Sequence, residues 1–166
     1  MFEVGDKIFY PLQGVGEVIQ IVDKEIGDNV VKFFRIKIFK SQITLFIPVD
    51  KTEENKIRPL ISSDELDNLY GILKENGHIL TRKKNIRYKN YYDKLKTGDI
   101  YKSVEVLRNL LIIQNNTGLT PREKGLMEKT LDLIVEELSY SANKDIDKDE
   151  IATRLTSHFK DNSSLN

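Results

Sequence analysis

A basic run with interleaved tyrosines contains the residue types in this sequence that are best suited to a chemical task. Seven basic residues lie between Arg82 and Lys96, against one acid, in a chain whose formal net charge is zero. Lysine and arginine neutralise phosphates, and the rings of Tyr88, Tyr91 and Tyr92 can lie along sugars or bases. The run therefore predicts a contact with nucleic acid, and a merely solvated helix face is the alternative.

Groups that could catalyse a reaction or bind a metal are sparse. The chain has no Cys, and its two histidines, His78 and His158, are expected in different elements without metal-ligand spacing. The carboxylates of residues 145–150 resemble part of a calcium loop. They lack the glycine and the bidentate glutamate of such a loop, which favours capping and solvation. We expect no enzyme activity, no cofactor, no metal and no small-molecule substrate.

The composition is that of an ordinary globular protein, with 39% hydrophobic and 31% charged residues. The N-terminal residues have acids where a signal peptide has its basic region, and no apolar run approaches the ~20 residues that span a bilayer. The lack of Cys fits a reducing compartment. We therefore expect a cytoplasmic protein that has no membrane contact.

The first 60 residues or so have the pattern of short β-strands. Residues 30–39 and 43–48 alternate with period two on both sides of a short link, which predicts a hairpin. The residues expected to face inward are Phe34, Ile36, Ile38, Ile43, Leu45 and Ile47. Residues 7–10 and 15–22 supply two earlier strands. Such strands must curl to bury one face, which favours a small SH3-like or Tudor-like barrel.

The remaining residues have a helical pattern, with capping boxes predicted at Ser62–Glu65 and Thr120–Glu123 and an N-cap at Asp99. The last helix is expected to begin at Asp147, with a staple between Ile146 and Ile151. Its predicted buried residues are Ile151, Leu155 and Phe159. The chain is thus predicted to be an α+β protein with two domains, a β-barrel over residues 1–60 and an all-α domain of about five helices over residues 61–166.

The basic run itself is expected to form a helix over residues 85–96. The residues predicted to face inward are Ile86, Tyr88, Tyr92 and Leu95. The basic side chains of the run, Arg87 and Lys89 among them, are expected to contact phosphates. Replacing both by Ala would then lower duplex affinity and leave the melting temperature nearly unchanged.

Four segments resemble parts of a known family. They are VGDKIFYPLQGVGEV near the start, LFIPV after the hairpin, RYKNYYDKLKTGD in the basic run, and VEVLRNL followed by GLTPREKGLMEKTLDLIVEEL. Together they resemble the CarD/CdnL family of bacterial transcription regulators, from Met1 to about Phe159. The first segment is also similar to the polymerase-binding module of transcription–repair coupling factors.

The resemblance implies a function in transcription. It implies that the N-terminal Tudor-like domain binds the β subunit of RNA polymerase by a strand edge. It also implies that the helical domain contacts double-stranded promoter DNA at the upstream edge of the bubble, and that the bound protein stabilises the open complex.

On the DNA side, the basic run and the resemblance together indicate one group of residues. The expected DNA contacts are Arg82, Lys83, Lys84, Arg87, Tyr88 and Lys89. Many family members have a Trp three residues before the position of Arg87, where this chain has Lys84. The wedge that such a ring provides is therefore in doubt, and phosphate contact by Lys84 replaces it as the expectation. Insertion of Tyr88 as a substitute wedge is the alternative, although its helical phase favours packing.

On the polymerase side, the family uses basic residues near the positions of Lys24 and Phe46. Lys24 keeps the charge and Phe46 does not. An outward Phe46 beside Thr44 would make an apolar contact with the polymerase, and packing of Phe46 within its own domain is the alternative. The predicted polymerase contacts are Lys24, Thr44 and Phe46.

Two other classes of function remain open at this point. One is a protein-interaction adaptor, in which the basic run is a solvated face and duplex affinity lacks the salt dependence of phosphate contacts. The other is an RNA-binding SH3-like module, which needs exposed aromatic rings on the barrel. Its candidates are Phe9, Phe33, Phe39 and Phe46.

Overall fold

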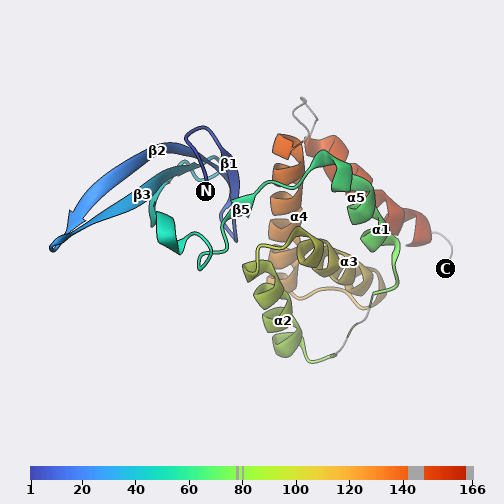
Figure 1. Cartoon of the computed structure of the whole chain (residues 1–166). Helices are drawn as coiled ribbons and strands as arrows, with labels where there is room; N and C mark the ends of the chain where they lie inside the picture. Colours follow the sequence, from blue (N-terminus) through green and yellow to red (C-terminus); the bar gives the residue numbers. More distant parts are fainter. Residues whose placement is uncertain (78, 80, 142–147, 164–166) are drawn as a thin grey trace. The chain divides into compact units, whose positions relative to one another are not determined.

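A computed structural model describes residues 1–77, 79, 81–141 and 148–163, and the chain divides into two compact units, Met1–Leu60 and Ile61–Asn166. The first unit contains the strands and the second contains the α-helices (Figure 1). The predicted α+β class, with a small antiparallel β unit followed by helices, is confirmed. Each unit is described separately below.

The β unit is one antiparallel sheet. Its strands are β1 (Lys7–Tyr10), β2 (Gly14–Ile26), β3 (Asn29–Ile38), β4 (Thr44–Pro48) and β5 (Arg58–Pro59), in the order β4-β3-β2-β1-β5. A short 3-10 helix, η1 (Val49–Lys51), follows β4. The hairpin of β2 and β3 extends well past the other strands (Figure 1). In this order β4 and β5 are the two edge strands.

The period-two pattern places the core of the β unit correctly, except at one position. Phe34, Ile36 and Ile38 are buried on β3, and Leu45 and Ile47 face the same core from β4. Ile43, which was expected to face inward, is exposed because it lies in the turn before β4.

A β-bulge in β2 changes which side chains share a face of the sheet. Val18 pairs with Ile36, but after the bulge Gln20 pairs with Arg35. Side chains alternate along a strand, so one extra residue transfers all later even-numbered side chains of β2 to the other face. The bulge therefore places Lys24 on the outer face.

The helical unit contains five α-helices within its described residues. They are α1 (Leu66–Lys74), α2 (Lys84–Lys96), α3 (Ile100–Asn116), α4 (Pro121–Ser141) and α5 (Lys148–Ser163). α3 and α4 pack against each other, α2 packs on both, and α1 packs on α3 and α5. The core of this unit includes Val104 and Leu107 from α3, Ile134 and Leu138 from α4, and Leu155 from α5.

Two of the predicted helix starts are confirmed. At α4 the Glu123 N–H donates to Thr120 Oγ1 (3.2 Å), and the Thr120 N–H donates to Glu123 Oε2 (2.9 Å). This is the reciprocal pattern of a capping box. At α3 the Asp99 carboxylate accepts from the Tyr101 N–H (2.9 Å). The preceding Gly98 has φ 72°, which a helix C-terminus favours in glycine.

The third predicted cap differs from the capping box. The Ser62 side chain accepts from the N–H of Asp64 (3.4 Å), and a 3-10 turn η2 (Ser63–Glu65) precedes α1. The Glu65 carboxylate accepts from the Tyr101 hydroxyl on α3, so it does not reach back to the cap. Glu65 thus bonds to a residue of another helix and not to the backbone of Ser62.

The first residue of the helical unit is fixed to α4 on both sides of its backbone. The Ile61 N–H donates to Glu137 Oε1 (2.9 Å), and the Ile61 carbonyl accepts from the Ser141 hydroxyl. Glu137 is buried, so its carboxylate is available to this backbone amide and not to solvent. These bonds set where the helical unit begins.

At the last helix, Leu155 is buried as predicted. Ile146 and Asp147, the expected staple and cap residues, lie outside the described residues, as do the side chains of Ile151 and Phe159.

Candidate functional site

The buried face of α2 differs from the one that the sequence predicts. Its buried residues are Arg87, Tyr91 and Leu95. Leu95 agrees with the prediction, but Ile86 is 47% exposed and Tyr88 and Tyr92 are only half-buried. The helix is thus rotated relative to the predicted phase, and an arginine occupies the position facing the core.

Arg87 forms a buried ion pair with Glu123 of α4. Its Nε and Nη2 each lie 2.5 Å from Glu123 Oε1, and the two side chains are 8% and 0% exposed. The second oxygen of Glu123 accepts from the Thr120 N–H and hydroxyl. The expectation that Arg87 lies free on the DNA-contacting surface is therefore corrected, because its guanidinium holds α2 against α4.

The carboxyl of Glu123 has a pKa below its ordinary value. Burial raises this pKa, but the Thr120 N–H, the Arg87 guanidinium and the Thr120 hydroxyl together lower it by more. A carboxyl whose pKa is lower in the folded state stabilises that state above the unfolded pKa, near 4.3 for glutamate. This contribution is lost as the pH falls through the lower, folded pKa.

We therefore expect the free energy of unfolding of the helical unit to fall as the pH drops below about 4.3. Glu123→Gln keeps an acceptor oxygen but cannot titrate, so it should show a smaller decline over the same range. Urea denaturation at a series of pH values, followed by helical circular dichroism, measures the unfolding free energy of both proteins. Parallel profiles for the two proteins would contradict a role for Glu123 in acid sensitivity.

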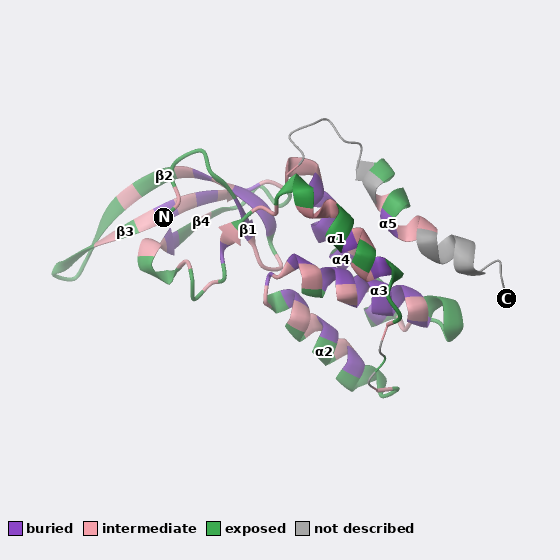
Figure 2. Ribbon diagram, turned by 45° about the vertical axis from the view of Figure 1, so that its right-hand side comes forward, coloured by how far each residue is buried: buried purple, intermediate pink, exposed green. Residues whose placement is uncertain are grey.

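The other basic residues predicted to contact DNA lie on the surface. Arg82, Lys83, Lys84 and Lys89 are exposed, around the first turns of α2. Figure 2 shows this end of the helix in the colour of exposed residues. Lys89 lies 3.1 Å from Asp93, an exposed pair of the kind that contributes little to stability. These four cations are thus available to an anionic partner.

Tyr88 forms part of a stack along one side of α2. The Arg122 guanidinium lies 4.0 Å from the centroid of the Tyr88 ring, and the rings of Tyr88 and Tyr92 are stacked with centroids 6.2 Å apart. Lys96 Nζ lies 5.4 Å from the Tyr92 centroid. Tyr88 is therefore packed between two neighbours. Arg122, the second residue of α4, adds a further cation here.

Two of the predicted polymerase contacts lie together on the outer face of the β unit. Lys24 Nζ lies 3.8 Å from the centroid of the Phe46 ring and 5.4 Å from that of Phe33. Phe46 is 43% exposed, so its ring lies outside the core. Thr44, the third predicted residue, is exposed on the same strand. A cation over an aromatic face is a favourable arrangement.

Strand β4 has a free edge. Within the described part of the chain it pairs only with β3, and the Ile38 N–H donates to the Ile43 carbonyl (2.9 Å) at the start of this ladder. In an antiparallel ladder, pairs that are hydrogen-bonded to each other alternate with pairs that are not. Ile43 is hydrogen-bonded to Ile38, so the N–H and C=O groups of Thr44, and likewise those of Phe46, point away from β3. The backbone of Pro48 also points away from β3, but proline has no N–H to offer. Two outward N–H groups are thus exposed to an incoming strand.

The aromatic residues that an RNA-binding barrel would need are mostly covered. Phe9 is buried, and Phe33 and Phe39 are half-buried. Phe46 is exposed, but Lys24 lies over its ring. This arrangement offers no row of open rings on which successive bases could stack.

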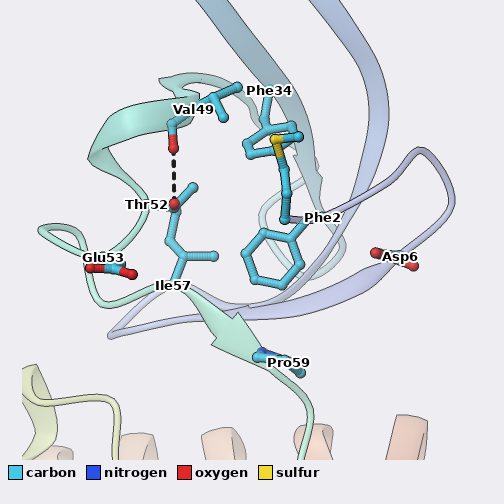
Figure 3. A pocket seen from close by; sticks show the side chains of 9 residues that line it. Phe2, Asp6, Phe34, Val49, Thr52, Glu53, Ile57 and Pro59 are labelled. Carbon is cyan, nitrogen blue, oxygen red and sulfur yellow. Dashed lines mark hydrogen bonds between the residues drawn. The ribbon is translucent and has the colours of Figure 1, made fainter.

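A cavity of about 650 Å³ opens in the β unit. The rings of Phe2 and Phe34 meet edge to face, with centroids 6.1 Å apart, and the carboxylates of Asp6 and Glu53 lie on opposite sides of the cavity (Figure 3). Acid–base catalysis by carboxylates needs two groups that converge on one bond. This cavity does not have that arrangement.

The described residues also contain no group of three or more His, Cys, Asp or Glu side chains placed to hold a metal ion. Part of the carboxylate segment 145–150 lies outside the described residues. No described helix has both the length and the apolar character needed to cross a membrane.

Comparison with known proteins gives matches over most of the chain. The model of the CarD-like/TRCF RID domain matches residues 2–61, and the model of the CarD C-terminal domain matches residues 68–156. A Bacillus subtilis (strain 168) protein named "Putative transcription factor YdeB" is 31% identical over 140 residues. The alignment covers 83% of this chain and 90% of the relative. Both matched domains are thus found in the order of the two units.

Proposed function

Because this chain belongs to the CarD-like family of transcription factors, we propose that it regulates transcription by binding the β subunit of RNA polymerase and promoter DNA together. The DNA contact lies near the upstream edge of the bubble, and the bound protein stabilises the open complex. The free edge of β4 is the observation that carries this proposal.

The polymerase contact uses β4 as a template for an additional strand. An unpaired edge offers backbone donors and acceptors to an extended segment of a partner. Here the N–H groups of Thr44 and Phe46 supply the donors, and the Phe46 ring with Lys24 over it supplies a surface beside the new strand. The backbone gives affinity and the side chains give selectivity.

The DNA contact is electrostatic and independent of sequence. Arg82, Lys83, Lys84 and Lys89 are exposed at one end of α2, and contacts from such cations to phosphates carry no sequence information. Binding to polymerase raises the local concentration of these cations at the promoter, so weak duplex affinity is sufficient. Arg87 supports this surface from inside the helical unit.

The proposal is tested by the lifetime of the open complex on one promoter, with and without the full chain. We expect a longer lifetime with the protein, and co-elution of the protein with the β-subunit lobe of the polymerase. An unchanged lifetime together with no co-elution would refute the proposed function.

The salt dependence of duplex binding tests the DNA side separately. Replacing Lys83 and Lys89 by Gln removes two phosphate contacts, so the slope of log affinity against log salt should become shallower by ~1.8. The unfolding free energy should change by less than ~0.5 kcal/mol, because both side chains are exposed. Lys129→Gln, an exposed position on α4, is the matched control. An unchanged slope in the double variant would mean that the duplex contacts neither Lys83 nor Lys89.

A further inference from the structure

A second cavity, of about 590 Å³, lies beside the start of α2. Arg82, Lys84 and Arg87 line it, together with Asn116 and Thr117 at the end of α3. None of the described residues that line it carries a carboxylate. Three cations thus border one concave space, whereas Lys83, between two of them in sequence, does not line it.

The guanidinium of Arg87 contributes to this cavity from a fixed position. Its Nε–H donates to Glu123 Oε1, Nη2 lies 2.5 Å from the same oxygen, and none of the described residues accepts a bond from Nη1. The Arg87 side chain is 8% exposed and borders the cavity. The ion pair with Glu123 therefore orients an arginine whose remaining donors are free for a ligand. A planar guanidinium suits the oxygens of a phosphate group.

The backbone at this end of α2 also favours an anion. The helix begins at Lys84, and its N-cap residue Lys83 makes no side-chain hydrogen bond to the first turn. The first N–H groups of a helix have no partner within the helix, and the helix dipole favours negative charge there. The Asn116 amide is a neutral group that can add a hydrogen bond to an anion, whereas the Thr117 hydroxyl donates to the Ile113 carbonyl (3.4 Å).

We propose that this cavity is a binding site for a phosphate-type anion, held by Arg82, Lys84 and the Glu123-oriented Arg87. Two sources share this chemistry, a backbone phosphate of the promoter and a free phosphorylated molecule such as a nucleotide. The volume lies within the range of small-ligand sites and exceeds the need of a single phosphate group. The inference deepens the DNA contact proposed above, and its test does not depend on polymerase.

The test is an NMR titration of the full chain with pyrophosphate at constant ionic strength. We expect saturable shifts at the amides of Arg82, Lys84, Arg87 and Thr117. Lys84→Gln and Arg82→Gln should each weaken binding about tenfold or more, because each removes a charged donor. Lys83→Gln removes the same charge from the same run without touching the cavity, so its affinity should match that of the wild type.

Absence of saturable shifts, or equal weakening by Lys83→Gln and Lys84→Gln, would overturn the proposal. A short duplex added to the pyrophosphate complex then identifies the source. Competition assigns the cavity to a backbone phosphate, and simultaneous binding assigns it to a free phosphorylated molecule. Pyrophosphate binding without any duplex or polymerase binding would support the anion site and refute the proposed function. The two hypotheses can therefore be refuted independently.

Discussion

Replacing Arg87 by Ala should lower the free energy of unfolding of the helical unit by about 3–5 kcal/mol. The change leaves the Glu123 carboxylate in a fully buried position without its cation. It also removes the packing of the arginine side chain between α2 and α4. Urea denaturation followed by helical circular dichroism measures the loss.

Two further variants identify the cause of this loss. Lys89→Ala removes an exposed cation from the same helix and should change the unfolding free energy by less than ~0.5 kcal/mol. Arg87→Lys keeps the charge but lacks the planar guanidinium that brings both Nε and Nη2 to Glu123 Oε1, so its loss should be intermediate. If Arg87→Ala costs no more than Lys89→Ala, the buried pair does not stabilise the fold.

This result changes how DNA-binding variants of the chain are interpreted. The sequence pattern led us to expect that Arg87 and Lys89 could both be replaced by Ala without a change in melting temperature. The buried ion pair makes that expectation wrong for Arg87. Weaker duplex binding by an Arg87 variant would therefore report a loosened helical unit as well as a lost contact. Lys83 and Lys89 are the positions at which affinity can be separated from stability.

Local signals in the sequence were sufficient for much of the fold. The alternation of Phe34, Ile36 and Ile38 gave the buried face of β3, since the period of a strand depends only on its own residues. The capping box of Thr120 and Glu123 marked the start of α4, because both of its bonds lie within four residues. Where the deciding partner is near in sequence, pattern and structure agree.

The phase of α2 could not be obtained in this way. Apolar residues alone favour a face with Ile86, whereas the structure buries Arg87. The partner that makes a buried arginine favourable is Glu123, 36 residues later. The spacing of Arg87, Tyr91 and Leu95 by four residues was the available signal. It becomes convincing only when an acid on another helix is known to meet the arginine.

The pairing of Lys24 with Phe46 was also beyond the sequence pattern. Both residues were predicted to contact the polymerase, but the strand that carries Lys24 was expected to end at Val22. The bulge between Val18 and Gln20 then decides which face Lys24 occupies. A change of one residue in register reverses the face of every later side chain, and nothing local in the sequence fixes that residue.

Replacing Thr44 by Pro should weaken binding to the polymerase β subunit roughly 10- to 100-fold, if β4 is extended by a strand of the partner. The Thr44 N–H points away from β3, so proline removes a donor to the partner without removing a hydrogen bond of the sheet. Thr44 is also the first residue of its strand, a position where proline is tolerated. The affinity for the isolated β-subunit lobe is the quantity to measure.

Thr44→Val separates the backbone from the side chain at this position. Valine keeps the N–H and the branched shape and loses only the hydroxyl, so its affinity should equal that of the wild type. The unfolding free energy of both variants should stay within ~1 kcal/mol of the wild type, since neither change affects the bonds between β3 and β4. If a folded Thr44→Pro protein binds as tightly as Thr44→Val, strand addition at β4 is wrong. The polymerase contact would then have to be sought on the face that carries Phe46 and Lys24, where affinity depends on side chains.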